Sequence, residues 1–244
     1  MILTGKTAIV TGGGQGIGQA ICRILAEEGA SVIVVDIEIL KARQTVSELT
    51  HEGFKAEATK TDISNGTEIK HLVDLVRQKY NHIDILINNA GLGLFRSIEE
   101  CTEEEWDQVM AVNLKGPFLL SKELLPIMKT QRKGTIINIV SVAGKTGGIA
   151  SGGPYSVSKA GLECLTKSLA RELAPYQVRV NGIAPGIIET QLTAHHKPSF
   201  IETIPLGSKG NPRDVAEAVL FLASSRSKHI TGEILDVNGG LLMD

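Results

Sequence analysis

Tyr155 and Lys159 stand four positions apart at the start of a segment with helical periodicity. Residues at this spacing share one face of a helix, so the lysine ammonium can lie beside the phenol. A neighbouring positive charge favours the phenolate and lowers the pKa of a tyrosine from its usual value of about 10. Such a phenol suits proton exchange with a carbinol or ketone oxygen, because acid/base catalysis works best when the pKa lies near the working pH. The same pair also arises by chance on solvated helix faces, so its place in the fold decides its meaning.

Two further polar residues could assist this chemistry. Ser141 closes the apolar run Thr135–Val140, and a hydroxyl at a strand end can donate to a substrate oxygen as negative charge develops there. The alternative is a turn serine that caps the strand end. Asn113 falls in the middle of a long predicted helix, where asparagine is unfavourable. A kink that frees a carbonyl or a water site near Lys159 would explain it, and a solvated asparagine is the alternative.

A glycine-rich segment follows the first apolar run. The residues from Thr11 to Gly18 read TGGGQGIG and lead directly into a helix. They do not fit a strict GxGxxG pattern counted from Gly12, because Ile17 takes the place of the third glycine, but they fit TGxxxGxG. Backbone without side chains lets a pyrophosphate approach the unpaired N–H groups at a helix N-terminus. A purely structural turn is the alternative.

Acidic and amide side chains follow the next predicted strands. The strand Ser31–Asp36 ends in a carboxylate, which can accept hydrogen bonds from both adenosine ribose hydroxyls or, alternatively, cap the next helix. Thr61–Ile63 and Asn88–Gly91 follow the third and fourth strands. Ligands of open parallel sheets bind at the carboxyl ends of the strands, so all three segments suit a dinucleotide. Gly91 permits close backbone approach, and Asn89 could brace neighbouring strands.

Short apolar runs alternate with amphipathic segments along most of the chain. The predicted strands include Thr7–Val10, Ser31–Asp36, Ile83–Ile87, Thr135–Val140 and Gln177–Ile183. Helical periodicity covers Ile17–Glu28, Glu68–Lys79 and Thr102–Thr130. This order predicts an α/β fold with a doubly wound parallel sheet and helices on both faces. We expect one domain over residues 1–244, with a substrate lid near residues 189–209, where periodicity is weak.

The sequence predicts the first residues of two helices. Thr102 to Glu105 reads as a capping box, and Asn211–Pro212 places an N-cap before a proline at the first helical position. Both predict helices that begin at these residues.

Composition and charge argue against several classes of protein. The formal net charge is −2, which gives no reason to expect nucleic acid or an anionic membrane as a partner. No apolar run is long enough for a membrane span, and the amino-terminal residues lack the apolar core of a signal peptide, so we expect a cytoplasmic protein. Cys22, Cys101 and Cys164 are expected to be reduced thiols. His195 and His196 lack a third ligand at a sensible spacing, so no metal is expected.

In their order along the chain, the motifs resemble those of the short-chain dehydrogenase/reductase family. They are TGGGQGIG, Asp36, Asp62, NNAG, Asn113, Ser141, YSVSK and Pro185–Thr190, and the match spans essentially the whole chain. The nearest members by pattern are the 3-oxoacyl-acyl-carrier-protein reductases and the bacterial polyol, glucose and hydroxysteroid dehydrogenases. The resemblance implies one Rossmann-type domain with about seven strands, in the order 3-2-1-4-5-6-7.

The resemblance also implies a role for each matching residue. Tyr155 would be the general acid/base, and Lys159 would lower its pKa and bind the nicotinamide ribose. Ser141 would stabilise the substrate oxygen, and Asn113 would hold a proton-relay water. The implied cofactor contacts are Gly12, Gln15, Gly16, Ile17, Gly18, Asp36, Ile37, Asp62, Ile63, Asn89, Ala90, Gly91, Tyr155, Lys159, Pro185, Gly186, Ile188 and Thr190.

We therefore predict an NAD(H)-dependent oxidoreductase that interconverts a secondary alcohol and a ketone. Asp36 would repel the additional phosphate of NADP(H), so NAD(H) is expected to be preferred. A 3-oxoacyl-acyl-carrier-protein reductase is the alternative. Three departures from those reductases put that substrate in doubt: the interval from Ser141 to Tyr155 is longer by a residue, Gly14 and Gln15 replace their serine-arginine pair, and the lid is shorter.

Two other classes of function compete with this prediction. A catalytically silent dinucleotide-binding sensor or scaffold would not require all of Asn113, Ser141, Tyr155 and Lys159. A nucleotide-sugar epimerase would normally need a larger carboxyl-terminal substrate domain than the residues after Pro185 provide. The complete catalytic set therefore favours an active oxidoreductase.

Substrate and assembly can be predicted only in outline. A small-molecule substrate is expected. The expected pocket walls, Leu92–Ser97, Val142–Pro154 and the lid, are mostly apolar, small or neutral, and no basic cluster there indicates a phosphate or carboxylate substrate. Arg96, Lys145 and Lys197 are isolated cations there. The long helix Thr102–Thr130 and the helix after Tyr155 are apolar beyond one face, which together with the family resemblance predicts a homotetramer with 222 symmetry.

Overall fold

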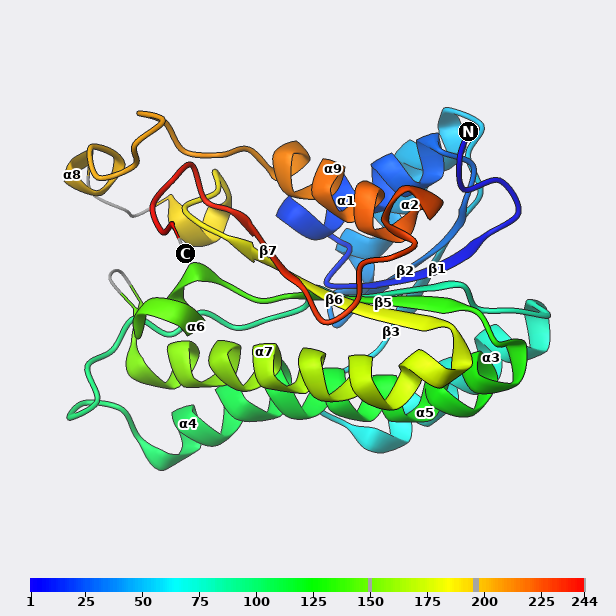
Figure 1. Cartoon of the computed structure of the whole chain (residues 1–244), viewed down its shortest axis with the longest axis horizontal. Helices are drawn as coiled ribbons and strands as arrows, with labels where there is room; N and C mark the ends of the chain where they lie inside the picture. The colour runs from blue at the N-terminus through cyan, green and yellow to red at the C-terminus, as the bar shows by residue number, and fades with distance from the viewer. Residues whose placement is uncertain (149–150, 195–197, 244) are drawn as a thin grey trace.

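The structure is a computed structural model that describes residues 1–148, 151–194 and 198–243. Its centre is a parallel sheet of seven strands in the order β3-β2-β1-β4-β5-β6-β7. Helices cover both faces of this sheet, so the molecule has three layers (Figure 1). The predicted α/β class, the doubly wound sheet and the strand order are confirmed.

The strands are short and rich in β-branched residues. They are β1 Thr7–Thr11, β2 Ser31–Asp36, β3 Ala56–Lys60, β4 Ile85–Asn88, β5 Gly134–Ile139, β6 Val178–Pro185 and β7 Ile234–Val237. In the middle of the sheet, Ile9 of β1 lies opposite Ile33 of β2 on one side and Leu86 of β4 on the other. Because all strands run in one direction, the loops that follow them meet at a single edge of the sheet.

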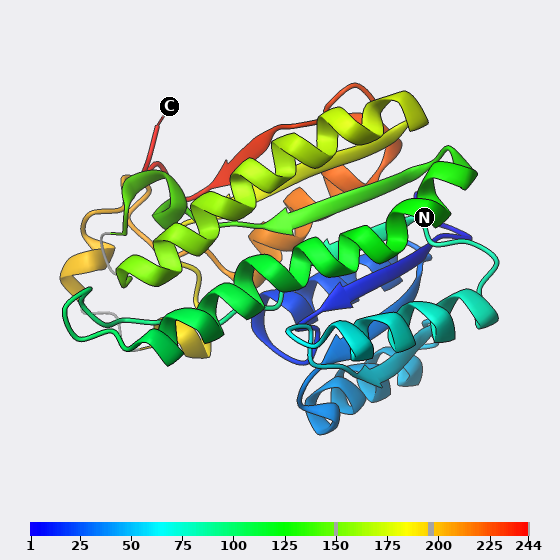
Figure 2. The ribbon, with the colours of Figure 1, turned by 90° about the horizontal axis from the view of Figure 1, so that it is seen from below.

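Three helices pack on each face of the sheet. One face carries α1 Gly16–Glu27, α2 Ile39–His51 and α9 Pro212–Ala223, and the other carries α3 Gly66–Lys79, α5 Gly116–Gln131 and α7 Gly153–Leu173 (Figure 1). The second group lies side by side across its face (Figure 2). Ile21 and Val219 are buried in the core of the first face, and Leu72 and Leu124 in the core of the second. The strands are therefore covered on both sides, as their continuous apolar runs predict.

Shorter elements complete the described fold. They are α4 Glu103–Met110, the π-helical turn η1 Ala111–Lys115, α6 Val142–Thr146, α8 Pro198–Ile201 and the 3-10 turns η2 Ala174–Tyr176, η3 Gln191–Thr193 and η4 Ser225–Ser227. The capping box at the start of α4 is confirmed: Thr102 Oγ1 accepts the Glu105 N–H at 3.2 Å, and Glu105 Oε2 accepts the Thr102 N–H at 3.1 Å. The cap at α9 is also confirmed, because Asn211 Oδ1 accepts the Arg213 N–H at 2.9 Å.

The predicted lid is not wholly irregular. It contains η3 and the single turn of α8, and within it Lys209 Nζ donates to the Thr193 carbonyl at 3.3 Å. The His195–His196 pair and Lys197 lie outside the described residues. Within the ranges that the structure describes, none of the helices is long and apolar enough to cross a membrane.

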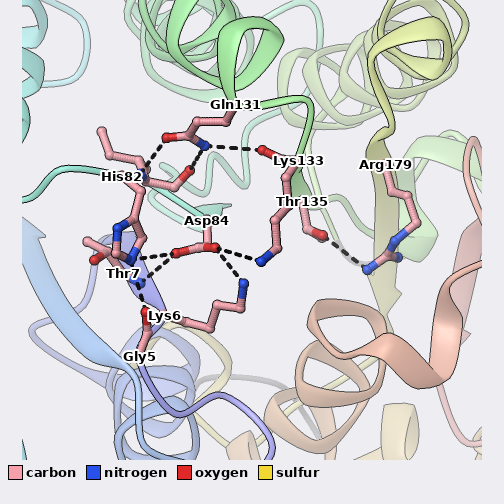
Figure 3. A network of polar contacts seen from close by, with 10 residues as sticks. Gly5, Lys6, Thr7, His82, Asp84, Gln131, Lys133, Thr135 and Arg179 are labelled. Carbon is pink, nitrogen blue, oxygen red and sulfur yellow. Dashed lines mark hydrogen bonds and ion pairs between the residues drawn. The ribbon is translucent and has the colours of Figure 1, made fainter.

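A charged cluster joins the amino ends of β1, β4 and β5, at the edge of the sheet opposite the predicted site (Figure 3). Asp84 accepts hydrogen bonds from Lys6 Nζ at 2.6 Å and from the Thr7 N–H at 3.1 Å. His82 Nε2 and Lys133 Nζ lie 3.3 and 4.0 Å from the same carboxylate, whose side chain is only 8% exposed. Burial lowers the pKa of Lys6, but the hydrogen bond and charge of Asp84 outweigh it, so the net shift is upward.

Replacing Asp84 with alanine should lower the free energy of unfolding by about 2–3 kcal/mol. The change leaves the Thr7 N–H unpaired and two cations without their carboxylate, and losing one partner of a buried pair costs about 3–5 kcal/mol when both are fully buried. Lys6 is 24% exposed, so we expect the lower value. Urea unfolding of Asp84→Ala and of Glu217→Ala, which removes an exposed ion pair with Arg213, provides the comparison. Equal stability of the two variants would contradict a structural role for the cluster.

Candidate active site

Three of the four predicted catalytic residues gather in a cavity wall where the strands end, and Asn113 lies outside that wall. A cavity of about 180 Å³ lies at this edge of the sheet, and Ser141, Tyr155 and Lys159 all line it. The other predicted residues in its wall come from the glycine-rich segment, the loop after β4 and the segment after β6: Ile17, Asn89, Gly91, Pro185, Gly186, Ile188 and Thr190. Parts of the sequence that are far apart thus meet around one space.

Tyr155 and Lys159 lie on one face of the first turns of α7. The Lys159 ammonium lies 5.7 Å from the centre of the Tyr155 ring and donates to the Ile139 carbonyl at 2.8 Å. Burial raises the pKa of Tyr155 above its ordinary value, although the neighbouring Ser141 hydroxyl opposes this shift. Burial also lowers the pKa of Lys159 to about 8. The predicted lowering of the Tyr155 pKa by Lys159 is therefore not found in the free site, where burial has the largest effect on the phenol.

Ser141 is the N-cap of the short helix α6. Its Oγ accepts the Ala143 N–H at 3.2 Å, which leaves the hydroxyl proton free to donate. The side chain lines the cavity beside Tyr155. The capping and catalytic interpretations of Ser141 are thus compatible, since each uses a different part of the hydroxyl.

Asn113 lies in the π-helical turn between α4 and α5. The Gly116 N–H bonds to the Ala111 carbonyl, five residues back instead of four. Pro117 has no N–H, so it cannot form the α-helical bond to the Asn113 carbonyl four residues before it. The local irregularity predicted at Asn113 is confirmed. The alternative of a solvated asparagine is wrong, because the side chain is 0% exposed.

The glycine-rich segment provides a cradle for an anion. Gly12 and Gly16 adopt positive φ angles of 63° and 55°, which favour glycine. A Cβ atom on Gly18 would lie 1.9 Å from the Gly12 carbonyl oxygen, so no side chain fits there. Helix α1 has no acidic residue in its first turn, and the side chain of its N-cap Gln15 makes no capping bond. Its first N–H groups can therefore bind a pyrophosphate.

Asp36 ends β2 beside this cradle. Its Oδ2 accepts the Gly14 N–H and its Oδ1 accepts the Glu38 N–H, both at 3.0 Å. Each carboxylate oxygen keeps a further lone pair for a ribose hydroxyl. Lys41 Nζ is bonded to Glu38 at 2.6 Å. The side chain of Ile37 is 56% exposed, next to this carboxylate in the chain.

The loops after β3 and β4 are fixed by their own polar side chains. Asp62 Oδ1 accepts the N–H and the hydroxyl of Ser64 at 2.8 and 2.7 Å, and the side chain of Ile63 is buried. Asn89 Nδ2 donates to the Thr11 carbonyl at 2.9 Å and to the Gly12 carbonyl at 3.1 Å. The predicted bracing of neighbouring strands by Asn89 is thus confirmed. The same contacts hold the Ala90–Gly91 backbone next to the glycine-rich segment.

The segment after β6 closes the cavity from the other side. A Cβ atom on Gly186 would lie 2.8 Å from the Asn238 Cα, so glycine is required for this close approach. Thr190 is the N-cap of η3, and its N–H donates to Thr193 Oγ1 at 3.1 Å. These residues connect the cavity wall to the predicted lid.

A family model described as short chain dehydrogenase matches residues 6–199. The chain belongs to the short-chain dehydrogenase family. The family resemblance found in the motifs and the predicted oxidoreductase class are confirmed.

Relatives of this family align over the full length of the chain. The 3-oxoacyl-[acyl-carrier-protein] reductases of Thermotoga maritima and Vibrio cholerae are 40% and 41% identical, with 100% of each chain covered. The crystal structure of 3-ketoacyl-(acyl-carrier-protein) reductase from Brucella melitensis complexed with NADH is 33% identical, with a TM-score of 0.93 over 99% of this chain and 100% of that one. These names match the predicted alternative, an acyl-carrier-protein reductase, more closely than the wider secondary-alcohol prediction.

The sequence motifs do not predict some residues of this short-chain dehydrogenase site. Ile187 and Leu241 line the cavity, although the pattern assigns them no role. Leu241 follows Gly239 and Gly240, and the apolar carboxyl-terminal segment suggests only a contact with another subunit. The pair of glycines is the sequence feature that indicates a turn after β7, and both adopt positive φ angles there.

Lys159→Met should increase the stability of the free short-chain dehydrogenase by about 2–3 kcal/mol near neutral pH. Each pKa unit corresponds to about 1.4 kcal/mol, so moving the Lys159 pKa from 10.5 to about 8 by burial costs roughly 3–4 kcal/mol. The loss of the bond to the Ile139 carbonyl offsets about 1 kcal/mol of the gain. Between these values the unfolded chain binds more protons than the folded one, so wild-type stability rises with pH there. The gain from Lys159→Met should therefore shrink as the pH rises from about 8 toward 10.5.

Denaturant unfolding of the wild type and of Lys159→Met at both ends of this pH window measures the difference in their free energies of unfolding. The contributions of the other titrating groups are the same in both proteins and cancel in this difference. A variant that is less stable than the wild type near neutral pH would contradict the account of Lys159 as a buried ammonium kept for function.

Proposed function

We propose that the chain reduces 3-oxoacyl thioesters to 3-hydroxyacyl thioesters with NADH, using Tyr155 as the general acid. The observation that carries the proposal is that Ser141 and Tyr155 line the same cavity as segments suited to a dinucleotide. The substrate class is taken from the full-length relatives named as 3-oxoacyl-[acyl-carrier-protein] reductases. A bound nicotinamide supplies the hydride for this reduction and accepts it in the reverse reaction.

The catalytic roles follow from the hydrogen bonds of the free site. The raised pKa of Tyr155 keeps the phenol protonated near neutral pH, so it can donate to a carbonyl oxygen. Ser141 donates its free proton to the same oxygen and stabilises the developing negative charge. Lys159, whose pKa of about 8 leaves it largely charged at neutral pH, favours the phenolate that remains. To the Asn113 carbonyl, which cannot accept a bond from Pro117, we assign a water that returns a proton to the phenolate.

The rest of the cavity suits an apolar acyl chain. Lys159 is the one charged residue among the described side chains that line it, and much of the wall is apolar: Phe95, Val142, Ile187, Phe200 and Leu241. Arg96 is paired with Glu105 at 2.7 Å, and Lys145 with Asp236 at 2.6 Å. Neither cation lines the cavity, which favours a substrate that is neutral around its ketone.

A substrate panel tests this proposal. Wild-type kcat/KM for reduction would be measured with NADH and either 3-oxoacyl thioesters, free and carrier-bound, or simple ketones. For oxidation it would be measured with NAD⁺ and polyols, sugars or hydroxysteroids. We expect the 3-oxoacyl thioesters to exceed every other class by at least about tenfold, or about 1.4 kcal/mol. A better polyol, sugar or steroid would overturn the substrate class. NADH binding without turnover of any compound would instead favour a silent dinucleotide-binding protein.

We also propose the homotetramer, on the strength of an apolar surface along α4 and α5. Trp106 and Phe118 are 38% and 45% exposed, and Phe118 borders a groove formed with Met110, Leu114 and Leu165. Exposed aromatic and methionine side chains around a groove are typical of protein interfaces. Multi-angle light scattering at micromolar concentration should give four times the chain mass, and Phe118→Glu should reduce it. A monomeric wild type would contradict this proposal.

A further inference from the structure

A line of hydrogen bonds connects the loop after β4, the π-helical turn and the first turns of α7. The Leu92 N–H donates to Asn113 Oδ1 at 2.7 Å, and Asn113 Nδ2 donates back to the Leu92 carbonyl at 2.9 Å. The same Nδ2 donates to Ser158 Oγ at 3.0 Å. Ser158 Oγ in turn donates to the Tyr155 carbonyl at 2.7 Å. Ser158 is thus the single side chain between Asn113 and the backbone of Tyr155.

Only a hydroxyl can make both of the Ser158 bonds. A carbonyl oxygen cannot donate, so the hydroxyl proton points to Tyr155 and a lone pair faces the Asn113 amide. The side chains of Asn113 and Ser158 are both 0% exposed, so water from the surface cannot replace a lost partner. An unpaired buried donor is costly, and the two elements therefore keep this spacing as long as the hydroxyl is present.

The side chains of Asn113 and Lys159 both lie close to Gly91. A Cβ atom on Gly91 would lie 3.3 Å from Asn113 Oδ1 and 3.5 Å from Lys159 Nζ. Lys159 follows Ser158 directly in α7, and its ammonium is held by the Ile139 carbonyl. A shift of α7 relative to the π-helical turn would therefore move Tyr155 and Lys159 together, away from Asn113.

We propose that Ser158 is a positioning residue that sets the distance between Asn113 and the Tyr155–Lys159 pair. It does not line the cavity, so it acts on the reaction through these neighbours and not by contact with substrate. This inference rests on the proposed function. It implies that the serine before Lys159 controls turnover while leaving the affinity for the dinucleotide nearly unchanged.

The test compares variants of the full-length protein that differ by the hydroxyl alone. Ser158→Thr and Ser158→Val add the same volume, but only threonine keeps a donor and an acceptor. We expect kcat with NADH and the best substrate to be at least about fivefold higher for Ser158→Thr than for Ser158→Val, since misplacement of catalytic groups lowers turnover. The dissociation constant of NADH, measured by fluorescence, should agree within about twofold between them. Equal kcat values would overturn the proposal.

Two further variants separate positioning from a general loss of packing. Ser156→Ala removes another buried hydroxyl from the same helix, bonded to the Gly152 carbonyl, and should leave kcat unchanged, whereas Ser158→Ala should lower it about tenfold. In an Asn113→Ala background, Ser158→Ala should have less than about a third of its effect, because the line is already broken. A full, additive effect in that background would contradict the proposal. A wild type without turnover of any substrate would instead refute the proposed function.

Discussion

Replacing Tyr155 with phenylalanine is expected to lower kcat by at least ~10²-fold while the dissociation constant of NADH stays within about twofold of the wild type. Phenylalanine keeps the ring that Lys159 faces at 5.7 Å and removes only the hydroxyl. General acid/base groups contribute about 10²–10⁴-fold to catalysis, and Tyr155 is the one phenol among the described residues of the cavity wall.

The control for this variant is Tyr176→Phe. Tyr176 lies in η2, where its ring contacts Lys129, and it does not line the cavity. Steady-state kinetics of both variants, with NADH binding measured separately, distinguish a lost proton donor from a damaged cofactor site. Wild-type turnover by Tyr155→Phe on the best substrate would mean that the general acid is assigned to the wrong residue.

The second large effect concerns the dinucleotide: kcat/KM with NADH should exceed that with NADPH by at least about tenfold. The additional phosphate of NADPH would lie within ~4 Å of the Asp36 carboxylate. Two unit charges at this distance repel by about 1 kcal/mol in water and ~4 kcal/mol at an effective dielectric of 20, which corresponds to a preference of ~10- to 10³-fold. Two backbone N–H groups hold this carboxylate in place, and Lys41 is already paired with Glu38. No free cation of this loop therefore offsets the repulsion.

Variants and salt can test the electrostatic origin of this preference. Asp36→Ser combined with Ile37→Arg should narrow or reverse the ratio, whereas Asp74→Asn, an exposed carboxylate on α3, should leave it unchanged. High ionic strength should also reduce the wild-type ratio, because salt screens charges near the surface. Equal or better use of NADPH by the wild type would mean that Asp36 does not face the ribose.

Much of the fold can be predicted because its signals are local. The strands β1, β2 and β4 are buried on both faces, so each appears as an apolar run between turn residues. The capping residues Thr102 and Asn211 fix two helix starts for the same reason. The seventh strand has no such signal, because Ile234–Val237 is only four residues long and contains Asp236, and it becomes a strand through its pairing with β6. The single-domain organisation and the cytoplasmic location stay predictions.

The parts of the site that escape the sequence depend on contacts between distant segments. The raised pKa of Tyr155 comes from burial, which a motif of five residues cannot report. The π-helical turn at Asn113 has only two local hints, an asparagine within a helix and Pro117 four residues later. Leu241 reaches the cavity from the far end of the chain. In each case the residue types indicate the chemistry, but the burial, backbone geometry and neighbours of these residues are set by the tertiary fold.

The most direct test of the account follows the hydride itself. NADH deuterated at the transferable position of the nicotinamide would be incubated with a short 3-oxoacyl thioester and the wild-type protein, and the product examined by mass spectrometry and NMR. We predict a 3-hydroxyacyl thioester with deuterium on the carbinol carbon, formed in amounts equal to the NADH consumed and almost absent with Tyr155→Phe. Thioester left unreduced under conditions where NADH is bound, or product without deuterium at that carbon, would contradict the claim that this site reduces the ketone by hydride transfer.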